Sequence, residues 1–205
     1  VRDRSLNYLG LVNELDLECS GIVIAGKTKE VRDQLANEFG SEKPMLRFAA
    51  FVSGRPEHEE FTIDTGLLKK RFEPWKMAVS RSRGRRSLSQ FRTIETFTET
   101  SYLHCMPLTQ RRHQLRAHLH SFRMPIIGDR TYHGKELYLS SLKPGYRQKR
   151  NQEEQPLIPR LALHAERLLF AHPVSGNEIE VLSPLPKYFK VALKYLRRYS
   201  PTADS

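Results

Sequence analysis

Short strand-like segments separated by brief turns constrain the fold of this chain more than any other feature. Apolar runs rich in β-branched residues predict strands over residues 22–25, 46–52, 91–98, 101–106, 161–170 and 178–182. Helical spacing is limited to residues 30–40, 112–123 and 186–199. Because strands outnumber helices and most connections are as short as hairpin turns, we expect an α+β fold with a mixed, mostly antiparallel sheet and flanking helices.

The 205 residues have the length of one domain, and that length is enough to bury a hydrophobic core. Between residues 135 and 160 apolar residues become rare, while Lys, Arg, Gln, Glu and Pro accumulate. We interpret this stretch as a surface insertion of a single domain over residues 1–205, because it is too short to form a second one.

Positive charge predominates: 34 Lys and Arg residues against 23 Asp and Glu give a formal net charge of +11. Such a surface attracts polyanions, and we expect nucleic acid to be the main partner. No apolar run approaches the roughly 18 residues of a membrane span, so we expect no membrane partner. Residues 81–90 form either a solvated loop or an arm that contacts phosphates, and its basic side chains are Arg81, Arg83, Arg85 and Arg86.

Two cysteines, Cys19 and Cys105, are too few for a disulfide framework or a zinc cage. Their number fits an intracellular, reducing compartment, with the cytoplasm and the mitochondrial matrix both left open. The histidines lack carboxylate or thiolate partners at ligand spacing, so we expect neither a metal nor a cofactor.

One acidic residue, Asp16, stands at a turn that leads through Gly21 into the expected strand 22–25. Functional groups are often displayed at the edge of such a rigid element. A lone Asp in a turn is more often structural, so a catalytic role requires a partner from elsewhere in the chain.

The same stretch formally matches a phosphate-binding loop, because Gly21 is followed after four residues by Gly26-Lys27-Thr28. The intervening Ile-Val-Ile-Ala favours an extended strand over a wrapped loop, and no hydrophobic strand closely precedes Gly21. We therefore interpret the match as accidental and expect no nucleotide binding.

A candidate partner for Asp16 occurs in the helical segment around residues 112–123. Leu115, Leu119 and Phe122 share one stripe of this helix, while Arg112, Arg116 and Arg123 share another. An arginine can donate two hydrogen bonds to a carboxylate and favours its ionised form. Arg116 is either this partner or part of a solvated helix face.

Several motifs in this order resemble the RluA-type RNA pseudouridine synthases, over nearly the whole length from about Leu9 to Pro186. They are Val12-Asn13-Glu14-Leu15-Asp16 with Cys19-Ser20-Gly21, Phe48 to Gly54, Thr109 to Leu119, Pro125 to Asp129 with Tyr132, Leu163-His164-Ala165 with His172-Pro173, and Pro184-Leu185-Pro186. The ordered set carries the resemblance, not any single motif.

The resemblance implies a cofactor-free isomerase that detaches uracil from its ribose in RNA, rotates it and rejoins it through carbon. It implies a fold with a central cleft, with Asp16 as the catalytic aspartate, Arg116 as its ion-pair partner and Phe48 as the aromatic residue that stacks on the base. Ribosomal RNA is the expected substrate, with tRNA as the alternative. The residues expected to contact RNA are Glu14, Arg81, Arg83, Arg85, Arg86, Arg111, Arg112 and His113.

The chain departs from the family pattern at several positions. Glu14 stands where Arg is usual, Phe48 where Tyr is usual, and Gln110 and Arg112 where Gly and Thr are usual. The family's N-terminal strand, expected before residue 9, is missing. Two hypotheses follow: an active RNA pseudouridine synthase, or a degenerate synthase that binds RNA as a ribosome assembly factor and contacts assembly intermediates.

Overall fold

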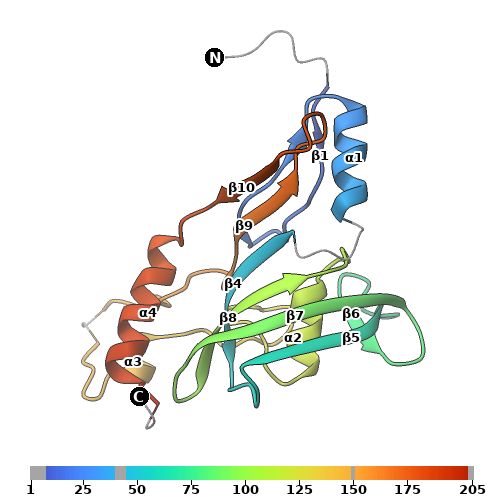
Figure 1. Cartoon of the computed structure of the whole chain (residues 1–205). Coiled ribbons are helices and arrows are strands. Elements are labelled where there is room, and N and C mark those ends of the chain that lie inside the picture. Colours follow the sequence, from blue (N-terminus) through green and yellow to red (C-terminus); the bar gives the residue numbers. More distant parts are fainter. Residues whose placement is uncertain (1–7, 40–44, 149–150, 203–205) are drawn as a thin grey trace.

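The computed structural model describes residues 8–39, 45–148 and 151–202 (Figure 1). Residues 1–7, which make up most of the segment before residue 9, lie outside the described part. The helices are α1 (Lys29–Phe39), α2 (Gln114–Ser121), α3 (Leu139–Leu142) and α4 (Lys187–Tyr199). The strands are β1 (Gly10–Leu11), β2 (Ser20–Gly21), β3 (Ala25–Gly26), β4 (Leu46–Ser53), β5 (Glu60–Lys69), β6 (Met77–Ser80), β7 (Arg85–Thr96), β8 (Thr100–Pro107), β9 (Leu163–Ala171) and β10 (Glu178–Leu182).

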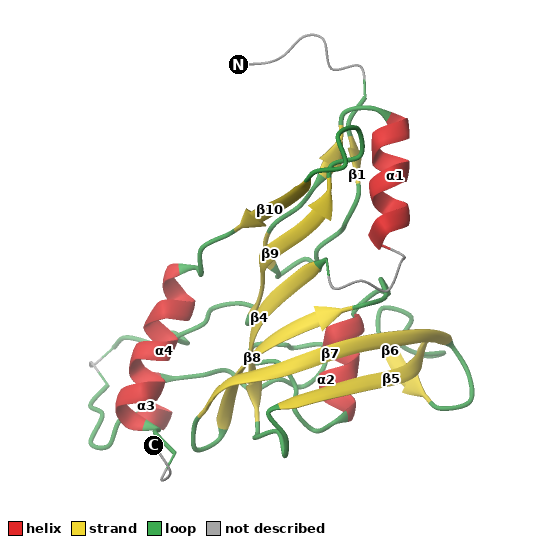
Figure 2. Cartoon of the chain, viewed as in Figure 1, coloured by secondary structure: helices red, strands yellow, loops and turns green. Residues whose placement is uncertain are grey.

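One sheet organises the described residues, in the strand order β10-β9-β4-β8-β7-β5-β6. All neighbours along this path are antiparallel, and β2 adds a short parallel pairing to β9. Strands β1 and β3 form a separate antiparallel ribbon, and α1 lies beside this ribbon (Figure 2). The expected α+β class with a mixed, mostly antiparallel sheet is confirmed.

The expected buried strand over residues 22–25 is wrong. Its place is taken by β2 and β3, and the residues between them form no strand. The side chain of Asn13 explains this, because its amide nitrogen donates to the carbonyl of Ile22 at 3.2 Å and its oxygen accepts from the N–H of Ile24 at 2.8 Å. These backbone groups are therefore satisfied without a strand partner.

The loop expected over residues 81–90 is shorter than predicted. Arg85 and Arg86 belong to β7, where they pair with Leu67 and Gly66 of β5, and only residues 81–84 connect β6 to β7. Gly84 allows this tight turn because it adopts a φ of 94°, and a Cβ there would lie 2.6 Å from the carbonyl oxygen of Leu67.

Aromatic side chains join α4 to the centre of the sheet. The ring centroid of Phe51 on β4 lies 5.1 Å from that of Phe189 on α4 and 5.2 Å from that of Tyr102 on β8. Within residues 135–160, Leu137 and Ile158 are buried in the same core. None of the helices in the described part of the chain is long and apolar enough to cross a bilayer.

Helix α2 is shorter than the segment expected over 112–123. Leu115 and Leu119 are buried as predicted, but Phe122 lies beyond the last turn and is 50% exposed. Arg123 also lies outside the helix, with a φ of 59°. The predicted stripes are therefore correct for the middle of the helix and wrong at its end.

We predict that His118 of α2 makes folding stability depend on pH. Its ring is fully buried, with Nδ1 3.1 Å from Ser89 Oγ and Nε2 3.3 Å from Thr65 Oγ1, and burial lowers the pKa of His118 from 6.5 to about 4. The unfolded chain thus binds this proton more readily. The free energy of unfolding should fall as the pH is lowered from 6.5 toward 4, by at most about 3 kcal/mol.

Urea denaturation across this pH range tests the prediction. His118→Gln should flatten the decline, while the control His58→Gln, at an exposed position, should leave it unchanged. Equal pH dependence in the wild-type protein and His118→Gln would contradict it.

Candidate active site

Asp16 lies on a loop between β1 and β2 that is held at both ends. Asn13 closes the base of the loop through its two hydrogen bonds to Ile22 and Ile24, and the N–H of Cys19 donates to the carbonyl of Asp16 at 2.8 Å. The carboxylate is therefore presented from a defined turn rather than from a freely moving segment.

The far end of this loop is fixed to β9. Gly21 has a φ of 115°, and a Cβ there would lie 2.1 Å from the carbonyl oxygen of Ala165, so the backbones approach as only glycine permits. The hydroxyl of Ser20 lies 2.9 Å from His164 Nδ1 and 3.1 Å from the hydroxyl of Tyr188. The turn expected at Gly21 is wrong, because Gly21 belongs to β2 and the chain turns at residues 17–18, but the pairing of β2 with β9 ties the Asp16 loop to the sheet.

The predicted ion pair between Asp16 and Arg116 is present. Arg116 Nη1 on α2 donates to Asp16 Oδ2 at 3.2 Å. The side chain of Arg116 is buried, so the alternative of a solvated helix face is wrong. Residues separated by 100 positions in the sequence thus meet at one point of the fold.

A second carboxylate, that of Asp129, holds Arg116 in place. Arg116 Nε donates to Asp129 Oδ2 at 2.7 Å and Nη2 donates to Asp129 Oδ1 at 2.8 Å. Asp129 is buried and also accepts the backbone N–H groups of Thr131 and Tyr132 at 3.0 and 3.1 Å. This two-point contact fixes the plane of the guanidinium and leaves Nη1 directed at Asp16.

Arg116 remains a cation despite its burial. Desolvation acts to lower the pKa of Arg116, but the hydrogen bonds and charge of Asp129, followed by those of Asp16, outweigh it and raise the pKa. The guanidinium carbon also lies 5.2 Å from the ring centroid of Tyr132. A permanent positive charge therefore stands beside the Asp16 carboxylate.

His113 approaches Asp16 from the other side. It precedes α2 with a φ of 53°, and its Nε2 lies 3.8 Å from Asp16 Oδ1 while its Nδ1 lies 3.2 Å from the Tyr132 hydroxyl. Burial lowers the pKa of His113, and the charges of Arg116 and Arg112 add to this effect against the opposing charge of Asp16. At neutral pH His113 is thus a neutral polar neighbour of the carboxylate.

Asp16 opens into a small pocket of about 60 Å³. Phe48 of β4 lines this pocket together with Asp16, Cys19, His113 and Leu163. Burial, followed by the charge of Asp16, raises the pKa of the Cys19 thiol to about 12, so Cys19 is not an ionised nucleophile at neutral pH. The pocket therefore brings together the carboxylates of Asp16 and Glu14 and the aromatic side chain of Phe48.

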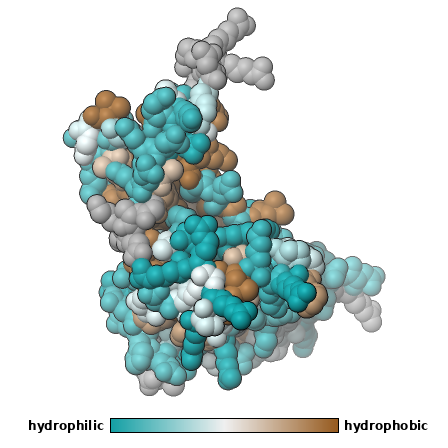
Figure 3. Space-filling model, turned by 90° about the vertical axis from the view of Figure 1, so that its right-hand side faces the viewer, coloured by the Kyte–Doolittle hydropathy of each residue, from teal (hydrophilic) through white to brown (hydrophobic). Residues whose placement is uncertain are grey.

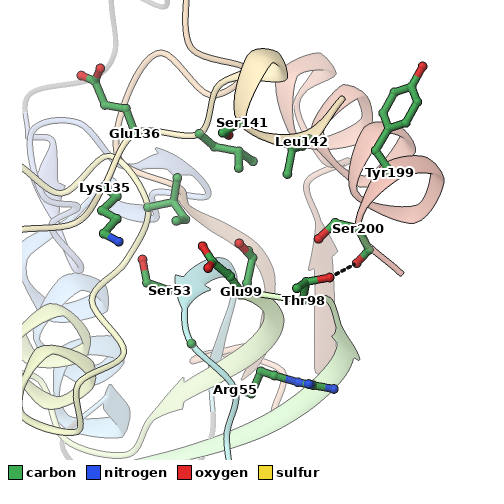
Figure 4. A pocket seen from close by; sticks show the side chains of 14 residues that line it. Ser53, Arg55, Thr98, Glu99, Lys135, Glu136, Ser141, Leu142, Tyr199 and Ser200 are labelled. Atoms are coloured by element: carbon green, nitrogen blue, oxygen red, sulfur yellow. Dashed lines mark hydrogen bonds between the residues drawn. The ribbon is translucent and has the colours of Figure 1, made fainter. Parts of the chain in front are cut away.

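A larger cavity, of about 800 Å³, lies elsewhere in the fold (Figure 4). It lies between the end of β4, the β7–β8 turn and the end of α4, where Thr98 Oγ1 donates to the carbonyl of Ser200 at 3.4 Å. Its charged lining residues are Arg55, Glu99, Lys135 and Glu136. Asp16, His113, Arg116 and Asp129 do not line this larger cavity. The size of a cavity alone therefore does not identify the candidate site.

The structure brings only some of the predicted RNA-contacting residues to the Asp16 pocket. Glu14, Arg111 and His113 line it. Arg112 is exposed, and it does not line the pocket. Burial lowers the pKa of Arg111, and the charge of the nearby Arg85 acts in the same direction.

The remaining predicted arginines lie on the connection between β6 and β7 and at the start of β7, away from the pocket lining. Arg81 and Arg83 are exposed on its turn. Arg86 forms an exposed ion pair with Asp64 at 3.0 Å. These three arginines therefore add positive charge outside the pocket without contributing to its lining.

Sequence reasoning included Asn13, Asp129 and Tyr132 in the ordered motifs but assigned none of them a role in supporting the site. Asp129 offered a signal, since an acid that follows the apolar run Pro125–Gly128 requires a buried partner. In the described residues no group of three or more His, Cys, Asp or Glu side chains could hold a metal ion.

Comparisons with known proteins agree with this geometry. The family model of RNA pseudouridylate synthase matches residues 1–121. An uncharacterized RNA pseudouridine synthase of Mycobacterium bovis is 31% identical over 92% of this chain and 56% of its own length. The dual-specificity RNA pseudouridine synthase RluA of Escherichia coli is 29% identical over 84% of this chain and 72% of its own length.

Solved structures share the fold. The human RNA pseudouridylate synthase domain containing 4 superposes with a TM-score of 0.71 at 24% identity, covering 92% of this chain and 76% of that one. The chain spans about half the length of several curated relatives, as with the 56% for the Mycobacterium protein. On the family model and the ordered motifs together, this chain belongs to the RluA-type RNA pseudouridylate synthase family.

Proposed function

We propose that this chain converts uridine to pseudouridine in structured RNA, with Asp16 as the catalytic residue. The observation that carries the proposal is the Asp16 carboxylate, held by the Arg116–Asp129 pair and facing a pocket lined by Phe48. Ribosomal RNA is the favoured substrate, because one relative is a ribosomal large subunit pseudouridine synthase D, from Nitrosomonas europaea. A tRNA substrate is the alternative.

The reaction needs no co-reactant. The bond between uracil N1 and ribose C1′ breaks, a bond between C5 and C1′ forms, the C5 proton leaves to solvent and N1 takes up a proton. No electrons are gained or lost, so the isomerisation requires no redox cofactor. A positioned carboxylate and a pocket that orients the uridine can catalyse it. Asp16 acts as nucleophile or base in its ionised form, and Arg116 orients the carboxylate through the hydrogen bond from Nη1.

The pocket dictates how the substrate enters. A volume of about 60 Å³ between Asp16 and Phe48 admits no part of a folded helix, so the target nucleotide must be turned out of its stack. Phe48 supplies an apolar aromatic face for the extruded uracil. The net charge of +11 supplies the attraction that holds the RNA backbone during this step.

A degenerate synthase that retains only RNA binding is the second candidate, and Glu14 is the observation in its favour. Glu14 is exposed at the rim of the pocket, and among the described residues its carboxylate has no ion-pair partner. It therefore repels RNA phosphates beside Asp16. Since Asp16, Arg116 and Phe48 are all in place, we favour the active enzyme.

We predict that Asp16→Asn abolishes isomerisation but changes RNA affinity less than about threefold, or under 1 kcal/mol. The substitution removes the reactive charge at nearly constant shape. Release of tritium from RNA labelled at uridine C5 measures turnover, and filter binding of the same RNA measures affinity. Turnover by Asp16→Asn would exclude the catalytic role, and absence of turnover by the wild-type chain on every RNA tested would favour the second candidate.

We predict that Asp129→Asn lowers kcat at least about tenfold, because Arg116 loses its charged anchor and no longer directs Nη1 at Asp16. The Km for RNA should change little, since Asp129 is buried away from solvent. Removing one partner of a buried pair should also cost about 3 kcal/mol of stability.

Asp64→Asn is the matched control for this experiment, because it breaks the exposed ion pair with Arg86. It should alter stability by less than about 1 kcal/mol and leave kcat unchanged. Equal kcat values for the folded Asp129→Asn and Asp64→Asn proteins would contradict the positioning role of Asp129.

A further inference from the structure

Two aromatic side chains are displayed on the loop between β5 and β6. Phe72 is 85% exposed and Trp75 is 53% exposed. Removing either aromatic side chain from water would be favourable. Trp75 is also the only tryptophan in the chain. Neither side chain belongs to the hydrophobic core, so their exposure calls for a partner outside the described fold.

Positive charges alternate with these aromatics. We define the aromatic loop as residues 69–76, with the sequence Lys-Lys-Arg-Phe-Glu-Pro-Trp-Lys. It holds four cations and one carboxylate. Aromatic faces set among cations are the combination that binds single-stranded nucleic acid, through base stacking and phosphate attraction.

The aromatic loop is closed by its one acidic residue. Glu73 binds the ammonium groups of both Lys70 and Lys76, at 2.9 and 2.7 Å, and the backbone N–H of Lys70 donates to the carbonyl of Lys76 at 3.1 Å. These contacts lower the pKa of Glu73 to about 2, so the clamp persists at neutral pH. Phe72 and Trp75 are therefore displayed from an ordered loop, which reduces the entropy lost on binding.

The base of the aromatic loop is tied to the candidate active site. Met77, the first residue of β6, donates its N–H to the Tyr132 hydroxyl at 2.8 Å. That same hydroxyl lies 3.2 Å from His113, and the Tyr132 ring lies beneath Arg116, the partner of Asp16. The loop is thus held at a fixed position relative to Asp16.

A hollow of about 290 Å³ adjoins the aromatic loop. Lys70, Lys76, His120 and His133 line it, beside the end of α2. Burial lowers the pKa of His120, and the charges of His133 and the two lysines contribute in the same direction. A backbone phosphate in this hollow would lie beside the ammonium groups of Lys70 and Lys76.

We propose that the aromatic loop stacks an unpaired base of the RNA substrate outside the catalytic pocket, with Phe72 and Trp75 as the stacking surfaces and the adjacent hollow receiving a backbone phosphate. The inference rests on the proposed function. A second copy of this chain is a poor occupant, because it would bring two loops of like charge together. The surrounding face is largely hydrophilic with small separate hydrophobic patches, as expected for nucleic-acid contact (Figure 3).

Fluorescence of Trp75 tests the proposal directly. Single-stranded oligoadenylate of about ten nucleotides should quench the emission on binding, because a stacked base contacts the indole. Inorganic polyphosphate offers the same charge without bases and should bind with little quenching. Phe72→Leu keeps an apolar side chain but removes the aromatic face, and it should weaken oligoadenylate binding by about 5-fold to 150-fold.

Phe122→Leu is the control, since Phe122 is a half-exposed phenylalanine outside the aromatic loop, and it should leave the affinity unchanged. In the isomerisation of an RNA that the wild-type protein converts, Phe72→Leu should raise Km and leave kcat unchanged. Oligoadenylate binding without quenching, or with equal affinity in Phe72→Leu, would overturn the proposal and leave the catalytic role of Asp16 untouched.

Two other results would also overturn it. A change in Trp75 emission with phosphatidylserine vesicles but not with oligoadenylate would identify a membrane contact. Concentration-dependent dimerisation that Phe72→Leu abolishes would identify a second copy as the occupant. Conversely, failure of the proposed isomerisation would appear as absent tritium release with quenching by oligoadenylate intact.

Discussion

The buried guanidinium of Arg116, shared between two carboxylates, is the interaction on which the candidate site depends. Asp129 takes two of its hydrogen bonds and Asp16 takes a third. A buried cation is tolerated only when it is paired, and here the pairing is arranged unequally. Asp129 is sealed from solvent and holds the guanidinium, while Asp16 faces the pocket and remains accessible to a substrate.

The sheet supplies the rigid frame for this arrangement. Strand β9 holds the Asp16 loop through its pairing with β2, and β4, its neighbour on the other side, presents Phe48 to the same pocket. Helix α2 carries Arg116 and is fixed to the sheet by the hydrogen bond between His118 and Ser89. Small displacements of these elements would separate Asp16 from its partner, so packing and proposed chemistry are linked.

Local pattern was sufficient for the parts of the fold that depend on nearby residues. The strand over 178–182 and the helix over 186–199 are confirmed almost to the residue, because apolar periodicity and turn residues bound both of them. Strands β5 and β6 were not predicted, since Gly66 and several polar residues interrupt the apolar pattern of a half-exposed pair at the sheet edge.

Only those residues of the candidate site that belong to recognisable sequence motifs could be predicted. The motif order identified Asp16, Arg116 and Phe48, but helical spacing placed Arg116 on a polar stripe with Arg112 and gave no sign of its burial. That burial depends on Asp129, which folds back onto α2 through a turn at Gly128 with a φ of 75°. A contact of this kind is decided by tertiary packing, and no local pattern encodes it.

The central claim, that a clamped Asp16 modifies uridine in RNA, is tested most directly by pseudouridine mapping of total cellular RNA. Cells that lack this protein would be compared with cells in which the wild-type or the Asp16→Asn protein is restored. The account predicts that at least one pseudouridine disappears without the protein and returns only with the wild-type chain. An unchanged map, or a site restored equally by Asp16→Asn, would contradict it.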